Sequence, residues 1–320
     1  MTTAKYDCLC AGIIVADHVC EPIERVPGPG ELVLTARTEL AIGGCASNVA
    51  VDLARLGRRV AVVGRVGDDV FGDFVGRALE SAGVDCRHLA RSQTAETSGT
   101  LIINTRGEDR RFIHSKGAND EFTGREISRE LIAGARVLYL GGFGLNALLT
   151  AANVQTLFEQ ARDAGVITVL DVVLPGPADY WSLLRPVLPW TDVFLPNEDE
   201  AALITGSDDP LQQAEQFRAA GAGTVVVTCG GRGAVLVSPS VRLRAEGYCV
   251  DFVDGTGSGD AFDAGYIHGL LDGCPPDDCL RYGSALGASC VRATGATNGV
   301  FNHLQLDEFV ATNELSITHL

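Results

Sequence analysis

The sequence predicts an α/β protein in which helices cover both faces of a mostly parallel β-sheet. Apolar segments rich in valine, isoleucine and leucine recur along the chain and are typical of buried parallel strands. They span residues 60–66, 135–140, 166–171, 192–196 and 224–229. Helical patterns separate them, as in parallel sheets. A chain of 320 residues, 46% hydrophobic and 21% charged, can bury a large core of this kind.

The segment SNVAVDLARLG, residues 47–57, predicts one of the covering helices. Val49, Leu53 and Leu56 fall on one face at helical spacing. Gly57 is well suited to end the helix, because glycine adopts the left-handed conformation common at helix ends.

Two stretches depart from this alternation and predict a small β-sheet lid. Residues 31–42 alternate in the manner of a strand, and residues 97–115 read as two strands joined by a polar turn at Arg106 to Asp109. Neither stretch is followed by a helix of its own. The predicted core is then residues 1–17, 43–96 and 118–320, and the predicted lid is residues 18–42 and 97–117.

The charge balance argues for a small-molecule protein. The chain has 41 acidic residues against 25 lysines and arginines, a net charge of −16. No basic field is present to attract a nucleic acid or an anionic membrane. The uncharged run at 137–158 is interrupted by glycines and asparagines, which predict a strand, a turn and a helix instead of a membrane span. The short apolar stretch between Asp7 and Asp17 lacks the basic leader of a signal peptide and resembles a buried strand, so a cytoplasmic location is expected.

The ten cysteines are scattered through the chain without any C-x-x-C pair. Most lie in apolar context, so free buried thiols are expected. His18 and Cys20 alone suggest a metal site, and two ligands without partners are weak evidence for one.

The stretch DGTGSGDAF, residues 254–262, carries the strongest chemical signal. The apolar residues after it recur at helical spacing, so the glycines form the turn that opens a helix. Backbone amides that converge at a helix N-terminus bind anions such as phosphate. Asp260 beside such an anion hole can accept a proton from a hydroxyl during phosphoryl transfer. The same residue could instead be an N-cap aspartate, so other segments must decide.

Five segments in order resemble the ribokinase-like, or PfkB, family of carbohydrate kinases, over nearly the whole chain. They are GGCASN at 43–48, VGRVGDDVFG at 63–72, NEDE at 197–200, TCGGRG at 228–233 and DGTGSGD at 254–260. The resemblance implies a three-layer ribokinase-like fold, ATP and Mg²⁺ as cofactors, and K⁺ beside the anion hole. Separately, the flat sheet of the lid should pair with a second copy, which predicts a homodimer.

The resemblance also implies roles for individual residues. Asp260 would be the catalytic base, and the backbone of Gly257, Ser258 and Gly259 the anion hole. The residues implied to hold sugar hydroxyls are Asp17, Gly43, Gly44 and Asn48. The residues implied for the nucleotide and the ions are Asn197, Thr228, Gly230 and Gly233 for ATP, Glu200 and Asn197 for Mg²⁺ through water, and Asp254 for K⁺. Asn48 and Glu200 could alternatively serve only their own helix starts.

Three positions depart from the family pattern. Gly255 and Ser258 replace a threonine and an alanine of the late motif, which functions mainly through its backbone. Val15 stands where the family usually has an asparagine two residues before Asp17, so a sugar contact is missing there.

Two other classes of function compete with the kinase. Gly142, Gly144 and Ala147 form G-x-G-x-x-A after a predicted strand, with Asp171 ending the next one, which is a dinucleotide-binding fingerprint. That reading leaves the five other segments unexplained. A catalytically inactive sugar or nucleoside sensor on the kinase fold is the second competitor, although a sensor has no need of Asp260.

The substrate is the least determined point. Acceptors that already carry a phosphate require cations, and the lid contains Arg106, Arg110, Arg111 and Lys116. We expect these four to be ordinary solvated lid residues. A small neutral sugar such as ribose or fructose is therefore the first expectation, a sugar acid such as 2-keto-3-deoxygluconate the second and a nucleoside the third.

Overall fold

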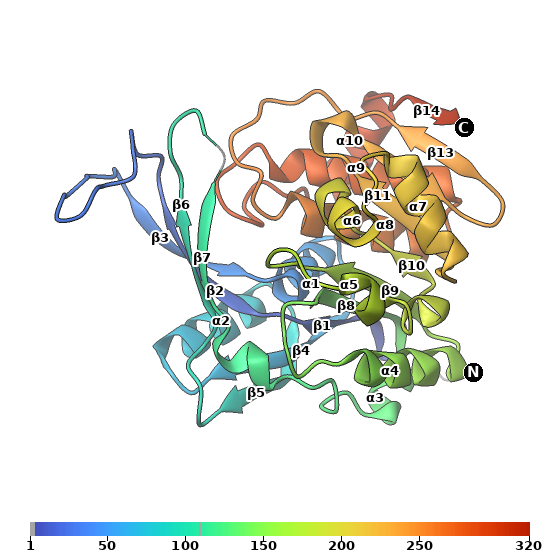
Figure 1. Ribbon diagram of the computed structural model, residues 1–320, viewed down its shortest axis with the longest axis horizontal. Helices are drawn as coiled ribbons and strands as arrows, with labels where there is room; N and C mark the ends of the chain where they lie inside the picture. The colour runs from blue at the N-terminus through green and yellow to red at the C-terminus, as the bar shows by residue number, and fades with distance from the viewer. Residues whose placement is uncertain (1–3, 109) are drawn as a thin grey trace.

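The computed structural model describes residues 4–108 and 110–320, in which a large sheet is sandwiched between helices (Figure 1). Ten strands form this sheet. In spatial order they are β14 (Ile317–His319), β13 (Arg242–Ala245), β12 (Ala234–Val237), β11 (Thr224–Thr228), β10 (Val193–Phe194), β9 (Ile167–Val172), β8 (Ala135–Phe143), β1 (Tyr6–Gly12), β4 (Val60–Gly67) and β5 (Asp85–Ser92). The strands from β5 to β11 are parallel, and β12, β13 and β14 pair antiparallel. The predicted fold class is confirmed.

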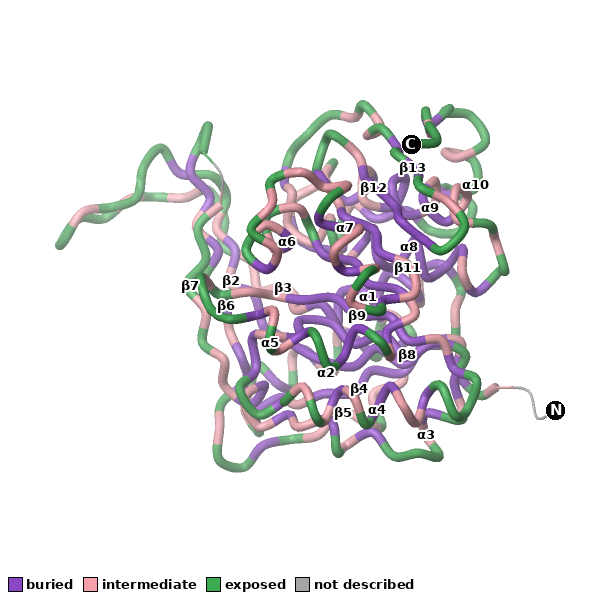
Figure 2. The backbone as a smooth tube through the Cα atoms, turned by 45° about the vertical axis from the view of Figure 1, so that its right-hand side comes forward, coloured by how far each residue is buried: buried purple, intermediate pink, exposed green. Residues whose placement is uncertain are grey.

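Alternation along the strands builds a hydrophobic core on each face of the sheet. Cys8 and Cys10 of β1 face one core, and Leu9 and Ala11 face the other. The first core is covered by α1 (Cys45–Arg55), α2 (Val70–Ser81), α8 (Ser258–Leu271), α9 (Pro276–Cys290) and α10 (His303–Thr312). The second is covered by α3 (Arg129–Ala133), α4 (Ala151–Asp163), α5 (Tyr180–Leu184), α6 (Glu198–Thr205) and α7 (Pro210–Ala219). Figure 2 shows the strands as mostly buried, with exposed residues on the outer faces of the helices and in the loops.

The order of strands creates a switch point beside β1. From β1 the chain proceeds outward to β4 and β5 on one side, and later from β8 to β9 and β10 on the other. In parallel sheets of this kind, a crevice opens at the carboxyl ends of the strands where the direction reverses. The ends of β1, β8 and β9 therefore mark the expected place for a ligand.

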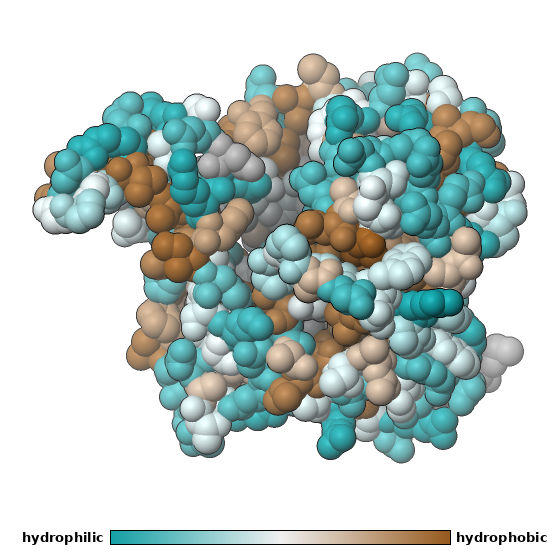
Figure 3. Space-filling model, in the orientation of Figure 1, coloured by the Kyte–Doolittle hydropathy of each residue, from teal (hydrophilic) through white to brown (hydrophobic). Residues whose placement is uncertain are grey.

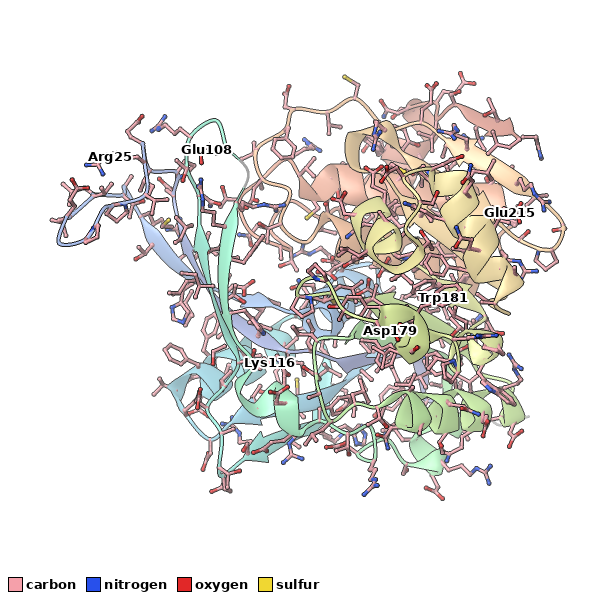
Figure 4. The ribbon with its side chains drawn as sticks, in the orientation of Figure 1. Arg25, Glu108, Lys116, Asp179, Trp181 and Glu215 are labelled. Carbon is pink, nitrogen blue, oxygen red and sulfur yellow. The ribbon has the colours of Figure 1, made fainter. Side chains whose placement is uncertain are left out.

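A second sheet of four strands projects from the large one. Its order is β3 (Thr38–Gly43), β2 (Val15–Cys20), β6 (Gly99–Ile103) and β7 (Arg111–Ser115). Figure 3 shows a hollow between this small sheet and the rest of the molecule. In Figure 4, Arg25 and Glu108 lie toward its far end and Lys116 lies at its base, near the short helix η1 (Gly117–Glu121).

The register gives the small sheet two different faces. Ala41, Asp17, Thr100 and His114 lie side by side across the four strands. The adjacent row is Leu40, His18, Leu101 and Ile113. Because neighbouring residues of a strand point to opposite faces, the polar row and the apolar row are on opposite sides of the sheet.

The strand predictions for the large sheet are confirmed, and the prediction for residues 31–37 is wrong. This stretch has no regular structure, and Leu32 and Leu34 are 86% and 83% exposed. Alternation favours a strand only where a neighbouring strand supplies hydrogen bonds, and here pairing begins at Thr38. The small sheet also starts at Val15, before the predicted lid boundary, so Asp17 belongs to it. Part of the predicted turn, Asp109, lies outside the described residues.

Other sequence predictions can be compared directly. The ten cysteines are all free, as expected. His18 packs edge-on against Phe71 instead of joining a group of metal ligands in the described part of the chain. Within residues 4–108 and 110–320, no helix combines the length and apolarity that a bilayer span requires.

Asp52 is an unusual residue in the core between α1 and the sheet. It is fully buried, and neither carboxylate oxygen has a hydrogen-bond partner. Burial raises the pKa of Asp52 well above its usual value, and the nearby Arg55 only partly offsets this. A carboxyl whose folded pKa is raised contributes fully to stability below its unfolded pKa and loses that contribution as pH rises through the folded pKa.

We therefore expect Asp52→Asn to stabilise the protein, and more so at alkaline pH. The variant cannot ionise, so it avoids the cost of a buried unpaired charge, an expected gain of about 1–3 kcal/mol in unfolding free energy at pH 8. Thermal unfolding of both proteins at pH 5 and pH 8 measures the difference. A gain that is as large at pH 5 as at pH 8 would contradict this account of Asp52.

Candidate active site

The candidate active site forms where the carboxyl ends of the central strands meet the N-termini of α1, α6 and α8. Asp171 is the last residue but one of β9, and Gly141 and Gly142 lie near the end of β8. The backbone amide of Gly142 donates to Asp171 Oδ2 at 3.3 Å. This is the crevice that the strand order predicts.

Asp260 lies in the first turn of α8 and faces α1. The side-chain amide of Asn48 donates to Asp260 Oδ2 at 2.7 Å, although 212 positions separate the two residues. Asp260 makes no capping hydrogen bond to its own helix, so it is not the N-cap that its position also allowed. Asn48 is likewise not a cap, since α1 starts at Cys45. Both side chains are therefore directed toward the crevice.

The turn before Asp260 requires glycine at one position. Gly257 is the N-cap of α8 with φ +76°, a left-handed conformation. A Cβ there would lie 2.4 Å from the backbone oxygen of Ala296. In contrast, a Cβ on Gly259 would meet no atom within 4 Å. The space beside Gly259 is thus open, whereas the Ser258 amide already donates to the backbone oxygen of Gly255 at 3.2 Å. Backbone amides at a helix start of this kind can bind an anion.

Four carboxyl groups lie close enough around this turn to influence one another's pKa: Asp171, Glu200, Asp260 and Asp263. Burial and the nearby Asp260 raise the pKa of Asp171 to about 7. Burial raises the pKa of Asp260 as well, while the Asn48 hydrogen bond lowers it. Asp263 and Glu200 also have raised pKa values, from burial first and then from Asp171. Carboxyls that raise one another's pKa would each be more readily ionised with a cation bound nearby, so the crevice favours a cation.

Asp17 stands on the small sheet at the edge of the crevice. It is 7% exposed. Burial and the charge of Asp260 raise the pKa of Asp17 to about 6, although a hydrogen bond from Thr100 lowers it. Thr100 Oγ1 is 3.1 Å from His114 Nδ1, and His114 Nε2 is buried without a partner. The polar row of the small sheet therefore offers hydrogen-bonding groups to a polyhydroxyl ligand.

The position of the Asp17 carboxylate leaves no room for a side chain at residue 43, which is glycine. A Cβ on Gly43 would lie 2.0 Å from Asp17 Oδ2 and 2.6 Å from Oδ1. Gly44 is the N-cap of α1 with φ +89°. The predicted sugar residues Asp17, Gly43, Gly44 and Asn48 thus lie where the small sheet meets the start of α1, and Asn48 connects this group to Asp260.

Asn197 and Glu200 begin α6. They form a capping box in which Glu200 N donates to Asn197 Oδ1 at 2.9 Å and Asn197 N donates to Glu200 Oε2 at 3.1 Å. Both side chains therefore cap their own helix. Each still has oxygen lone pairs that could accept other hydrogen bonds. Thr228, at the end of β11, forms a parallel bridge with Asn197. Gly230 starts the short helix η3 (Gly230–Arg232), and Gly233 follows it.

Asp254 has more partners than the sequence suggested. Its Oδ1 accepts from the amide and hydroxyl of Thr256 at 2.9 and 2.7 Å, and its Oδ2 accepts from Gly295 N at 2.9 Å. Arg110, which directly precedes β7, donates to Asp254 Oδ1 at 3.3 Å and to Thr256 Oγ1 at 2.9 Å. Burial by itself raises the pKa of Asp254. The hydrogen bonds and Arg110 outweigh this effect and hold that pKa below its usual value.

Four residues of the site carry no recognisable signal in the sequence: Cys45, Thr100, His114 and Tyr139. Tyr139 is buried, with its hydroxyl 3.1 Å from Asp263 Oδ2 and 3.4 Å from Asp171 Oδ2. Asp171 was noticed only as part of a dinucleotide fingerprint. That fingerprint lacks its helix, because α4 starts at Ala151, well after Gly144. A carboxylate at the end of a buried strand was the available signal for Asp171.

Comparison with curated proteins gives relatives over most of the chain. The chain is 29% identical to a ribokinase of Haemophilus influenzae over 308 residues, 93% of this chain and 96% of that protein. It is also 29% identical to a 2-dehydro-3-deoxygluconokinase of Bacillus subtilis over 281 residues, 84% of this chain and 86% of that protein.

Comparison with solved structures shows the same fold. An Arabidopsis thaliana ribokinase complexed with ribose and ATP matches with a TM-score of 0.81 and 22% identity, over 96% of this chain and 99% of that one. A putative ribokinase II from E. coli, in complex with ATP and Mg²⁺, matches with a TM-score of 0.82 and 21% identity, over 96% of this chain and 100% of that one. A model of the pfkB family carbohydrate kinases matches residues 5–302. The chain therefore belongs to the pfkB family of carbohydrate kinases and is an ATP-dependent sugar kinase.

Proposed function

We propose that the protein transfers the terminal phosphoryl group of ATP to a hydroxyl of a small neutral sugar, with Asp260 as the general base. The observation that carries the proposal is the 2.7 Å hydrogen bond between Asn48 and Asp260. It joins the residues suited to hold sugar hydroxyls to the carboxylate at the anion-hole turn. A sugar bound by Asn48 and Asp17 would have a hydroxyl within reach of Asp260.

The chemistry follows from this arrangement. Asp260 accepts the proton of the attacking hydroxyl as the new oxygen–phosphorus bond forms. The amides of Gly257, Ser258 and Gly259 stabilise the negative charge on the transferred group. Asp17 and the amide of Asn48 fix the sugar, since carboxylate and amide groups both hydrogen-bond hydroxyls. Adenosine diphosphate and the sugar phosphate are the products.

The crevice also suits Mg²⁺ and ATP. Asn197 and Glu200 are proposed to hold Mg²⁺ through water, because their oxygens are ligands of the type that this ion prefers. When bound, Mg²⁺ supplies positive charge to the phosphates. Thr228, Gly230 and Gly233 lie next to Asn197 along the same edge and are proposed to contact the nucleotide.

The lid cations support a neutral sugar over a phosphorylated one. Arg106 pairs with Glu24 at 2.8 Å, Arg111 pairs with Glu108, and Lys116 lies 3.7 Å from Asp120. Arg110 contacts Asp254. Each of the four therefore has an acidic partner, whereas a phosphate on the acceptor would need cations of its own.

A coupled kinase assay with ATP tests the substrate. We expect turnover with a neutral sugar such as ribose or fructose. A sugar acid is the second candidate because of the similarity to the Bacillus subtilis enzyme, and a nucleoside is the third. Turnover only with a sugar acid or a nucleoside would replace the neutral-sugar proposal. Tight sugar binding without any turnover would favour the inactive sensor.

We also propose that K⁺ binds beside Asp254 and that Arg110 partly takes its place. The guanidinium supplies the positive charge that Asp254 would otherwise draw from an ion. Arg110→Ala should therefore make turnover more dependent on K⁺, by about fivefold for an ion pair of about 1 kcal/mol. The measurement is the ratio of turnover in potassium and in tetramethylammonium at equal ionic strength. An unchanged ratio would show that Arg110 and K⁺ do not act at the same place.

The small sheet is also proposed to form a homodimer. Leu101 and Ile113 are paired on its outer face and are 49% and 59% exposed. Strand β7 is an edge of this sheet in the described structure, and such edges pair readily with another copy. We expect light scattering to give a dimer at micromolar concentration and Ile113→Asp to give a monomer. A wild-type monomer would exclude the interface.

As an ATP-dependent enzyme, the protein would act in the cytoplasm.

A further inference from the structure

A thiol lies directly beside the proposed base. Cys45 is the first residue of α1 and is 7% exposed. Cys45 Sγ and one carboxylate oxygen each of Asp171 and Asp260 all lie within 4.8 Å of one another. These three ligand atoms come from α1, β9 and α8, which are separate parts of the fold. The proposed kinase chemistry gives the thiol no role.

Neighbouring groups hold these side chains in place. The Asn48 amide donates to Asp260 at 2.7 Å, and Gly142 N donates to Asp171 at 3.3 Å. Asn48 is 3% exposed, and its Oδ1 is buried without any partner. That oxygen belongs to the same amide that contacts Asp260, so an unused acceptor lies beside the three ligand atoms. Hydrogen bonds of this kind orient the ligands of metal sites.

We propose that Cys45, Asp171 and Asp260 form a binding site for a soft divalent cation, such as Zn²⁺ or Cd²⁺, and that its occupation inhibits the kinase. Tetrahedral zinc holds ligand atoms about 3.5 Å apart, so the side chains need to move inward by only about an ångström. The thiol proton leaves to solvent when the metal binds. Neither Asp171 nor Asp260 has a lysine or arginine partner among the described residues.

The choice of metal follows from the thiol. Thiolates favour zinc and other soft ions, whereas Mg²⁺ prefers oxygen ligands and keeps several waters. Mg²⁺ would therefore not replace the soft ion at this site. The metal site itself does not depend on the proposed function. The inhibition does, because a metal bound to Asp260 prevents that carboxylate from accepting a proton.

Titration of the full-length protein with CoCl₂, without ATP or Mg²⁺, tests the site. We expect one equivalent of Co²⁺ to give the near-ultraviolet absorption of a cobalt–thiolate bond. Cys45→Ser should lose this band and bind at least about tenfold more weakly. Cys249→Ser, which removes an exposed thiol, should keep both the band and the affinity. A band that persists in Cys45→Ser, or no band in the wild type at millimolar Co²⁺, would overturn the proposal.

Inhibition is measured separately, with ZnCl₂ and CdCl₂ in the kinase assay. The concentration for half inhibition should rise by at least about tenfold in Cys45→Ser and stay unchanged in Cys249→Ser. If Cys45→Ser fails to fold, Cys45→Ala gives the same comparison. Cobalt binding through Cys45 without any inhibition would support the metal site and contradict Asp260 as the base, so the two proposals can fail independently.

Discussion

Asp260→Asn is expected to lower kcat by about 10²–10⁴, the range of a general base, and to leave the KM for the sugar nearly unchanged. The asparagine has the same size and keeps an oxygen that can accept the Asn48 hydrogen bond. It also removes a carboxyl whose pKa is raised by burial, so folding should not suffer. Steady-state kinetics, together with a thermal unfolding curve, measure both effects.

Asp263→Asn is the matched control for this variant. Asp263 is one turn further along α8 and is a buried carboxyl, but its side chain contacts Tyr139. The control removes a carboxyl from the same helix and should lower kcat by less than about tenfold. If Asp260→Asn folds and retains more than about a tenth of wild-type turnover, Asp260 is not the base.

Gly43→Ala is expected to weaken sugar binding strongly while leaving ATP binding almost unaffected. The new methyl group would lie 2.0 Å from Asp17 Oδ2, so the Asp17 carboxylate must turn away. Hydrogen bonds to a charged group contribute about 1.5–3 kcal/mol, which corresponds to an increase in the KM for the sugar of about tenfold or more. Initial rates at varied sugar and varied ATP separate the two constants.

Gly99→Ala is the control within the same small sheet. A Cβ there would be 3.6 Å from the backbone oxygen of Ala16, an ordinary contact, so its kinetics should match the wild type. Wild-type sugar affinity in Gly43→Ala would show that Asp17 does not contact the substrate. Equal increases in the KM for sugar and for ATP would instead indicate a general distortion of the site.

The large sheet could be predicted because its signal is local. A strand such as β11 is a run of apolar residues, and burial on both faces of a parallel sheet demands such a run. Residues 31–37 show the limit of this reasoning. Their alternation is as regular as that of a strand, but whether a strand forms depends on a partner elsewhere in the chain.

The site was predictable where a motif reflects backbone geometry. The positive φ of Gly257 is a local requirement, and the glycines of the segment indicated it. The contact between Asn48 and Asp260 is different, because it depends on how α1 packs against α8. The same holds for Cys45, Asp171 and His114, which no spacing along the chain brings together. Such convergence is a property of the tertiary fold.

If Asp17 holds the acceptor as proposed, its placement on the small sheet affects which acceptors can react. Asp17, Thr100 and His114 belong to the projecting sheet, whereas Asn48 and Asp260 belong to the large domain. An acceptor is held by both parts only if it is long enough to reach from one to the other. A water molecule spans no such distance and gains nothing from the second set of contacts. Hydrolysis of ATP by water is then disfavoured, because only an acceptor long enough to contact both the small sheet and Asp260 is held in place.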